Sequence, residues 1–349
     1  MLRVTLRDLQ WRRRRFVITI VGTSLVFAMT LLLTGLSNGF RVEANNTVDA
    51  LGFDVYLAKA GPAGPFIGSP PFPESEVALV ERIPGVISAV PLVFTTTTAP
   101  EGDSTRNVNL FGVPAQGPGM PAIATGRAPS GVDEAAVSST LGTDVGGQIE
   151  IGSRSMRIVG IVEDSTALAG QPNVFLTVPG AQLDGFSGQP IVSSIGVHGA
   201  PAKAPDGYRI VDRAGAVGDL MRPMNAAEGA LTMLSVLLWI VAALIVGSVI
   251  YLSALERTRD FAVLKAVGVS TRSVLAGLCL QAVIIAVLAA VLGGLLSLVL
   301  VPVFPMRVVV STSAFLLLPV TAVLIGLLAS AAGLRRAVSI DPALAFGGP

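Results

Sequence analysis

Four long apolar segments divide the chain, and polar segments of very different lengths separate them. Their interiors contain no Asp, Glu, Lys, Arg or His. Each can supply the ~20 apolar residues that cross ~30 Å of hydrocarbon at ~1.5 Å per helical residue. A buried helix of a soluble protein, the alternative, rarely stays uncharged over such a length. We therefore expect four transmembrane helices, at residues 16–40, 228–255, 273–302 and 312–334.

The third and fourth apolar segments are expected to form a hairpin. Pro302 and Pro305 interrupt the pattern between them, and Arg307 is the only charge there. Proline ends a helix because it lacks an N–H donor and clashes with the preceding turn. Residues 303–311 should therefore be a short outer loop. Pro319 is expected in the first turns of the fourth helix or at a kink in it.

The segment between the first two spans, residues 41–225, is long enough for a domain with its own core. Short runs of β-branched residues bounded by Gly, Pro, Ser and Thr are typical of strands. A helix is expected to begin within residues 73–81, and the Gly/Pro-rich stretch 60–73 should be a flexible or extended loop. We expect a mixed α+β fold. The clearest strand candidates are Gly85–Val90, Val108–Val113, Met156–Val162 and Asn173–Val178.

Basic residues near the spans predict the orientation of the chain. Twelve of them lie in the short polar segments 1–15, 256–272 and 335–349, against four acids. Between Arg41 and Arg222, eleven basic residues stand against eighteen acidic ones. Because Lys and Arg collect on the cytoplasmic side of spans, we expect a multi-pass protein of the bacterial plasma (inner) membrane with both termini in the cytoplasm. The large α+β domain would then be extracytoplasmic.

The first 15 residues are expected to form a short amphipathic helix. Leu2, Leu6 and Leu9 share one face, and Arg3 and Arg7 lie beside it. Such a helix would lie in the headgroup region of the membrane lipid. A disordered basic tail is the alternative.

Composition excludes several functions. Hydrophobic types make up 52% of the chain and charged types 13%, so much of it must face an apolar phase. The net charge of +1 and its distribution argue against a nucleic-acid partner. With one cysteine and one histidine, neither an intramolecular disulfide nor a His/Cys zinc site can form. No lysine follows a glycine, so a GK[ST] phosphate-binding loop is absent and any ATP must be bound by another chain.

The residues also indicate a non-catalytic chain without a cofactor or metal. The pairs Asp133-Glu134 and Glu163-Asp164 would point to opposite faces of a strand, so they are interpreted as solvated turn residues. His198 lies in a Gly/Ala/Pro-rich stretch and is interpreted as a structural surface residue. Cys279 is interpreted as a small packing residue inside an apolar helix.

The cytoplasmic segment 256–272 is the most informative part of the sequence. Charged residues extend the second span, and a short helix with apolar positions three residues apart follows. Gly268 would end this helix, and Ser270 or Thr271 could cap the third span. Apolar side chains on a charged cytosolic helix favour a partner groove, although they could also lie against the membrane. The candidate docking residues are Glu256, Arg257, Arg259, Asp260, Phe261, Leu264, Lys265, Val267 and Gly268.

This segment resembles the cytoplasmic signature of FtsX-like, MacB-type ABC transporter permeases. The run ERTRDFAVLKAVGVSTRSVL, which begins at Glu256, is similar to the family pattern E-R-x-R-E-I-x-x-L-[RK]-A-x-G-A. Asp260 replaces the usual Glu, and Phe261 replaces the usual Ile. Further stretches at residues 6–15, 134–164 and 335–345 resemble the family's N-terminal entry, extracytoplasmic core and C-terminal signature. The resemblance therefore covers the whole chain in matching order.

The resemblance implies a partner and a mechanism. In this family the cytoplasmic segment forms the coupling helix that docks on the ATPase. It implies a permease homodimer bound to two copies of a P-loop ATPase, which would bind the ATP and Mg. ATP binding and hydrolysis would move the second span and, through it, the extracytoplasmic domain, which could engage a periplasmic or extracellular partner. The substrate need not pass between the helices.

Three classes of function follow from these observations. Export or extraction of a peptide, lipid, lipoprotein or drug-like substrate is favoured. A mechanical signal relay that activates a cell-wall hydrolase or senses an extracellular ligand shares the same sequence features. An intramembrane enzyme is disfavoured, because no histidine and no acidic pair lies within the spans. The GxxxG of Gly35 and Gly39 and the pair Gly293-Gly294 allow close helix contact, either at a dimer seam or within one subunit.

Overall fold

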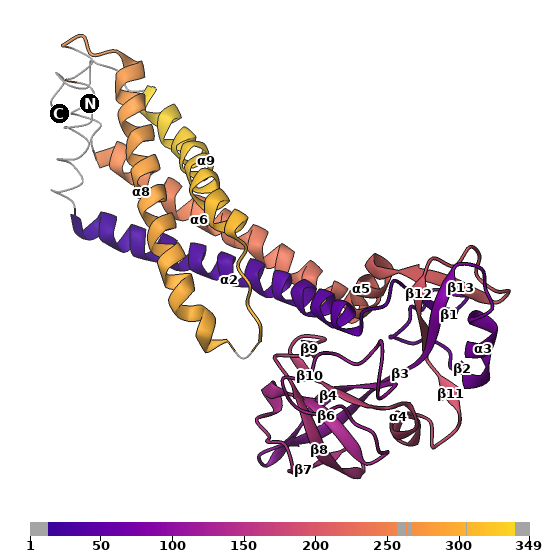
Figure 1. The fold of residues 1–349 in the computed structure, drawn as a ribbon. Coiled ribbons are helices and arrows are strands. Elements are labelled where there is room, and N and C mark those ends of the chain that lie inside the picture. Colours follow the sequence, from indigo (N-terminus) through magenta and orange to yellow (C-terminus); the bar gives the residue numbers. More distant parts are fainter. Residues whose placement is uncertain (1–12, 257–262, 264–266, 305, 339–349) are drawn as a thin grey trace. The chain divides into compact units, whose positions relative to one another are not determined.

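A computed structural model describes residues 13–256, 263, 267–304 and 306–338 (Figure 1). The chain divides into two compact units. The helical unit contains the described residues up to Asn38 and from Ala227 onward, and the β unit contains residues Gly39–Ala226.

Long apolar helices make up the helical unit. They are α2 (Arg13–Leu51), α6 (Asn225–Glu256) and α8 (Thr271–Leu300), and each contains an apolar stretch long enough to cross a membrane. α9 (Thr312–Val338) contains a shorter apolar stretch, Thr312–Leu324. Within the described parts of the chain, three helices therefore have the length and composition of a membrane span. The expected fourth span, 312–334, stays a prediction.

A turn that packs on α2 connects α8 and α9. The short 3-10 helix η4 (Val301–Val303) contains Pro302 and follows α8 directly. The N–H of Val309 donates to the carbonyl of Gly35 at 2.9 Å, and Asn38 Nδ2 donates to the carbonyl of Val309 at 2.8 Å. Pro319 lies inside α9, about two turns after its first residue.

Glycines allow close packing within the helical unit. A Cβ atom on Gly293 of α8 would lie 2.8 Å from both the Cβ of Phe27 and the carbonyl oxygen of Ser24 on α2. A Cβ atom on Gly35 would lie 2.7 Å from the side chains of Val308 and Val310. Of the two explanations for these small residues, contact within one subunit therefore holds for Gly35 and Gly293.

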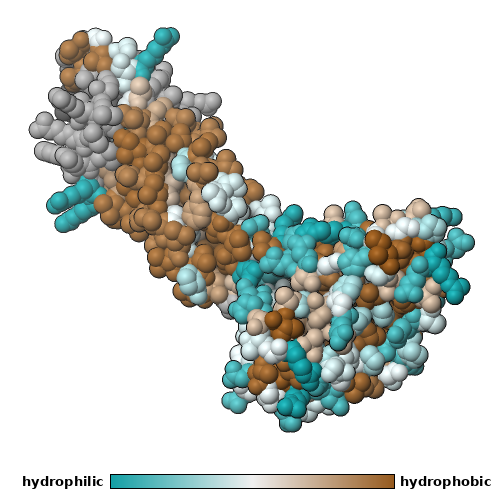
Figure 2. Space-filling model, viewed as in Figure 1, coloured by the Kyte–Doolittle hydropathy of each residue, from teal (hydrophilic) through white to brown (hydrophobic). Residues whose placement is uncertain are grey.

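The outer surface of the helices is apolar. Ile18, Val299 and Leu316 are among the large apolar side chains that are mostly exposed. Figure 2 shows a broad hydrophobic surface over the helices, whereas hydrophilic residues dominate the surface of the β unit. Soluble monomers rarely expose apolar surface over such an area, and a lipid-facing surface accounts for it.

The β unit is a mixed α+β domain. Its larger sheet has eleven strands in the order β13-β1-β12-β3-β4-β10-β6-β8-β5, with β7 paired to β8 and β9 paired to β10, and β11 and β2 form a separate pair. Most neighbours are antiparallel, but β10 is parallel to β4 and β6 is parallel to β8. The strands are β1 Val55–Lys59, β2 Phe72–Pro73, β3 Val86–Glu101, β4 Ser104–Val113, β5 Thr125–Gly126, β6 Glu134–Ser138, β7 Gln148–Ile151, β8 Arg154–Val162, β9 Thr166–Ala167, β10 Gln171–Thr177, β11 Ile191–Val192, β12 Ser194–Gly199 and β13 Tyr208–Asp212.

All four predicted strand candidates overlap strands, namely β3, β4, β8 and β10, although Gly85 precedes β3 and Val178 begins α4. Short helices cover the sheet: α3 (Val77–Val80), α4 (Val178–Gly185) and α5 (Arg213–Met221), with 3-10 turns η1 (Glu74–Glu76), η2 (Ser139–Leu141) and η3 (Arg222–Met224). The predicted helix start within 73–81 is confirmed by η1 and α3. Asp212 caps α5, since its side chain accepts a bond from the N–H of Gly215 at 2.8 Å.

Aromatic rings fill the centre of the β unit. Phe111 on β4 packs against Phe94, Phe66 and Phe175, with ring centroids 5.0, 6.1 and 5.4 Å away. Edge-to-face and offset contacts of this kind stabilise a core beyond the area they bury. Phe66 comes from the Gly/Pro-rich stretch 60–73, so this loop contributes a buried residue to the core.

Candidate functional site

The predicted docking segment is described only in part. Arg257, Arg259, Asp260, Phe261, Leu264 and Lys265 lie outside the described residues. Glu256, Val267 and Gly268 are described, and they stand at the two ends of the segment.

Glu256 is the last residue of α6 and forms an ion pair with Arg15 near the start of α2. Arg15 Nη1 lies 3.0 Å from Glu256 Oε1, and Arg15 Nη2 donates to the carbonyl of Val249 at 3.0 Å. Two bonds from one guanidinium thus connect the N-terminal end of α2 to the C-terminal end of α6. The carboxylate is about half exposed, so the ion pair contributes at most ~1 kcal/mol.

A tight turn leads from the docking segment into α8. The N–H of Val267 donates to the carbonyl of Val263 at 3.0 Å. Gly268 then adopts a φ of 93°, a conformation that ends helices and favours glycine. Ser270 caps α8 by accepting a bond from the N–H of Ser273 at 3.3 Å. The predicted cap at Ser270 is confirmed. The predicted helix that Gly268 would end lies mostly outside the described residues.

Val267 leaves an apolar side chain uncovered at this turn. It is 80% exposed, and Val263, four residues earlier, is 47% exposed. The described end of the docking segment therefore presents an apolar edge next to a sharp reversal of the chain.

In the β unit, the loop 60–73 is organised by one buried carboxylate. Asp219 on α5 accepts bonds from the N–H groups of Gly64, Phe66 and Ile67 at 3.1, 2.8 and 2.9 Å. Arg222 pairs with the same carboxylate. Of the two expectations for this stretch, a flexible or an extended loop, the hydrogen bonds to a buried charge oppose the first, because they fix its backbone. A signal was present in the sequence, since Asp219 is the only acid in the apolar pattern of α5.

A second carboxylate connects the end of α2 to α5. Asp49 Oδ1 and Oδ2 accept bonds from Arg213 Nε and Nη2 at 2.5 and 2.7 Å. The hydrogen bond from Arg213 lowers the pKa of Asp49 below its usual range. The fork of an arginine fits a carboxylate with two parallel bonds, so this pair fixes the orientation of the two helices as well as their distance.

The acidic pair Asp133-Glu134 has structural partners, whereas Glu163 and Asp164 lie in an exposed turn, as expected. Glu134 is the first residue of β6 and accepts bonds from Arg127, Ser130 and Gly131. The interpretation as a solvated turn residue is wrong for Glu134, whose side chain is only 19% exposed. Asp133 pairs with Arg154 at 2.6 Å and remains mostly exposed, as expected.

His198 makes contacts that suit a structural role. Its Nδ1 lies 3.5 Å from Asp54 Oδ2, and its ring packs on Phe53 with centroids 5.6 Å apart. Among the described residues, no group of three or more His, Cys, Asp and Glu is placed to hold a metal ion.

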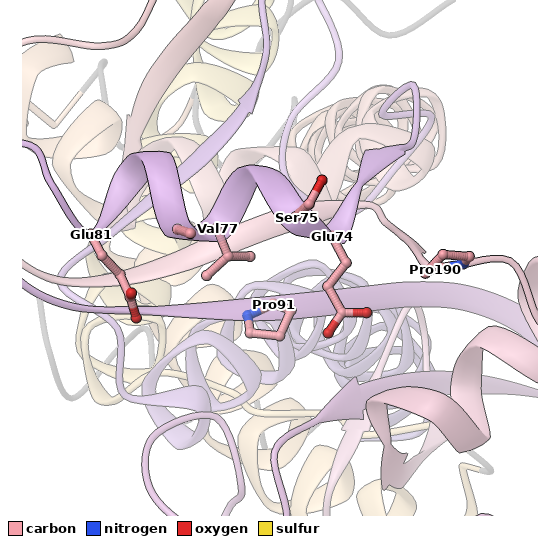
Figure 3. A pocket seen from close by; sticks show the side chains of 7 residues that line it. Glu74, Ser75, Val77, Glu81, Pro91 and Pro190 are labelled. Atoms are coloured by element: carbon pink, nitrogen blue, oxygen red, sulfur yellow. The ribbon is translucent and has the colours of Figure 1, made fainter.

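A shallow cavity of about 460 Å³ lies between the helical segment η1–α3 and strand β3. Figure 3 shows the side chains of Glu74, Val77 and Glu81 directed toward Pro91 on β3. Gln182 Nε2 donates to Glu74 Oε2 at 2.8 Å, so one of the two carboxylates already serves the fold. The cavity combines an apolar floor with a carboxylate at each end of the helical segment.

Two family models match this chain. A MacB-like periplasmic core domain matches residues 16–208, and an FtsX-like permease C-terminal domain matches residues 232–342. An uncharacterized ABC transporter permease of Mycobacterium tuberculosis H37Rv is 63% identical over 349 residues, with 100% of both chains covered. A second one from that strain is 58% identical with the same coverage. A Staphylococcus haemolyticus protein described as a hemin transport system permease, HrtB, is 20% identical over 357 residues, with 98% of both chains covered.

Two solved structures are similar to part of the chain. The extracellular domain of the ABC-type transporter YknZ covers 50% of this chain and 94% of its own, with a TM-score of 0.31 and 16% identity. The periplasmic region of MacB from Actinobacillus actinomycetemcomitans covers 51% and 86%, with a TM-score of 0.32 and 12% identity.

The family assignment rests on the relatives that match over the full length and on the two family models, which together cover most of the chain. It agrees with the long apolar helices that accompany a large β unit. The chain therefore belongs to the family of MacB- and FtsX-type ABC transporter permeases.

Proposed function

We propose that this permease is the non-catalytic membrane subunit of an ATP-driven machine whose P-loop ATPase is a separate chain. Two ATPase copies and a second permease copy would complete the assembly, with four spans per permease and both termini in the cytoplasm of a bacterial cell. The ATP and its Mg would be bound by the ATPase, because this sequence has no GK[ST].

The observation that carries the proposal is the apolar edge beside Gly268. Val263 and Val267 are exposed at the end of a segment that joins two long apolar helices, α6 and α8. An exposed apolar edge next to charged residues suits a partner groove. The ion pair of Arg15 and Glu256 would help to transmit a movement of this segment to α2 as well as to α6.

The work done outside the membrane is proposed to be export or extraction of a peptide, lipid, lipoprotein or drug-like molecule. The hemin transport role in the name of the S. haemolyticus relative supports an apolar substrate. The alternative is a signal relay that acts on a cell-wall hydrolase or responds to an extracellular ligand. Reconstitution in vesicles distinguishes the two, since only a transporter shows ATP-dependent movement of its substrate.

Substitution in the docking segment tests the proposal. Leu264→Asp or Phe261→Asp should insert normally but lose the ATPase on co-purification, because a buried carboxylate would oppose docking. We expect at least a tenfold loss of bound ATPase. Val303→Asp is the matched control: this apolar residue is also exposed but lies in η4, at the other end of α8, and should retain the ATPase. Unchanged ATPase binding and turnover in Leu264→Asp and Phe261→Asp would refute docking at this segment.

A further inference from the structure

A buried polar chain connects α2 with the centre of the sheet in the β unit. Glu43 and Thr47 lie four residues apart on α2, so they share one face of the helix. Their exposed fractions are 2% and 3%, although one is a carboxylate and the other a hydroxyl. Buried polar groups of this kind need partners, and both find them in residues far along the chain.

The partners of Glu43 belong to the β9–β10 hairpin. Thr166 Oγ1 donates to Glu43 Oε1 at 3.1 Å, and the N–H of Gly170 donates to Glu43 Oε2 at 2.9 Å. Thr47 Oγ1 donates to the carbonyl of Thr166 at 3.1 Å. One face of α2 therefore contacts both arms of the hairpin.

The chain of bonds continues into the sheet. Asn173 Nδ2 on β10 donates to Thr47 Oγ1 at 3.1 Å, and Asn109 Nδ2 on β4 donates to Asn173 Oδ1 at 3.0 Å. Both asparagines are fully buried. Since β4 and β10 are adjacent inner strands, the bonds lead from α2 to the middle of the sheet.

The turn between β9 and β10, which is hydrogen-bonded to Glu43, has an unfavourable backbone conformation. Leu168 and Ala169 adopt φ values of 50° and 67°, followed by Gly170 at 85°. Residues with a side chain rarely adopt this left-handed conformation, and it persists where surrounding contacts impose it. Neither Leu nor Ala has a side-chain polar group that could stabilise the turn locally, as Asn would. The bonds from Glu43 and Thr47 supply the constraint from outside.

We infer that Glu43 and Thr47 are positioning residues through which movement of α2 changes the conformation of the hairpin 164–170. The inference rests on the proposed ATP-driven function, because that function supplies the movement. α2 is one continuous helix from Arg13 to Leu51, so a rotation or shift of its first part reaches Glu43. When Glu43 leaves the N–H of Gly170, the strained turn relaxes, and β10 and β4 lose their polar connection to the helix.

Hydrogen exchange on the full permease–ATPase complex tests this inference. Peptides that cover residues 164–172 should exchange at least threefold faster in the ATP-bound complex than in the nucleotide-free complex. In Glu43→Gln the same peptides should exchange fast in both states, because an amide cannot accept both bonds that the carboxylate accepts. ATP turnover should stay close to that of the wild type, which a general loss of folding would not allow.

Two further variants keep the test decisive. Thr47→Val removes the hydroxyl with little change of shape and should give a partial form of the Glu43→Gln result. Asp49→Asn is the matched control: it also removes a carboxylate from α2, but its partner Arg213 is not part of the hairpin. Its hairpin should respond to ATP as in the wild type.

The outcomes separate the two proposals. If ATP changes exchange in α2 but leaves residues 164–172 unchanged in the wild type, the inference fails and the proposed function stands. If ATP changes exchange nowhere in the permease, both fail. If Glu43→Gln responds to ATP as the wild type does, Glu43 has no positioning role.

Discussion

Two carboxylates of the β unit respond to their surroundings in opposite directions. Hydrogen bonds from Arg127, and then from the N–H of Ser130, lower the pKa of Glu134 far below its ordinary value of 4.5. Burial raises the pKa of Asp184 above 3.8, although Arg154 lies 3.0 Å away and acts against this. Neither residue forms a catalytic pair with the other acids, so the shifts concern stability.

The signs of these shifts predict the pH dependence of unfolding. Glu134 contributes stability above pH ~4.5 and loses it as the pH falls, because its folded pKa is the lower one. Glu134→Gln should therefore cost about 1 kcal/mol at pH 7, less than the full strength of its bonds because Arg127 is half exposed. The difference from the wild type should shrink toward pH 3.

Asp184→Asn provides the opposite comparison. The folded pKa of Asp184 is raised, so its contribution is present at low pH and lost as the pH rises through that pKa. The thermal midpoint, followed by circular dichroism in detergent, should thus change with pH in opposite senses for the two variants. Equal pH profiles for both would contradict these assignments.

At the scale of elements, small residues allow the long apolar helices to pack closely against one another. Ala286, Ala289 and Ala290 on α8 are buried among neighbouring helices, and Gly293 lies against the backbone of α2. Lipid gives apolar side chains no reason to avoid the helix surface, so close packing supplies the association. A side chain at Gly293 would clash with α2, so α2 and α8 lie close together at this position.

Adding a methyl group at this crossing tests its role. Gly293→Ala should destabilise the helical unit by ~1–3 kcal/mol, because the new Cβ meets backbone atoms that cannot move aside easily. Gly277→Ala on the same helix is the control, since nothing lies within 4 Å of its Cβ position and alanine favours a helix by up to ~1 kcal/mol. The thermal midpoint in detergent should fall for the first variant only. A fall of equal size in both would show that the effect is not due to this crossing.

For the whole molecule, the charge distribution of the sequence predicts which side of the membrane each polar segment faces. With Cys279 replaced by serine, Ser130→Cys in the exposed part of the β unit should react with a membrane-impermeant thiol reagent on intact cells. Val267→Cys, at a position that is also exposed in the structure, should react only after the membrane is opened. The reverse pattern would invert the orientation that the basic residues predict.

The sequence predicted the parts of the molecule that follow from local patterns. The strands β3, β4, β8 and β10, the glycine turn at Gly268 and the cap at Ser270 depend on neighbours in sequence, so they could be read directly. The role of Glu43 could not, because Thr166 and Gly170 lie more than 100 residues away. Asp219 stands out as the only acid of α5, but the loop that it binds also lies more than 100 residues away. The prediction of a solvated side chain failed for Glu134 for a related reason. Two adjacent acids in the sequence do not indicate which arginine the fold brings next to one of them.

Asp219 binds the backbone of the loop around Phe66, and this affects how many substitutions the loop can tolerate. All three donors are backbone N–H groups, so the bonds do not depend on the side chains of the loop. Some loop positions are still restricted by their own chemistry: a Cβ on Gly64 would overlap the carboxyl group, and Gly61 and Gly68 have φ values of 151° and 68°. Phe66 and Phe72 are buried in the core. The exposed side chains of Ala60 and Pro62, by contrast, could be exchanged for residues of another character while the buried carboxylate continues to fold the loop.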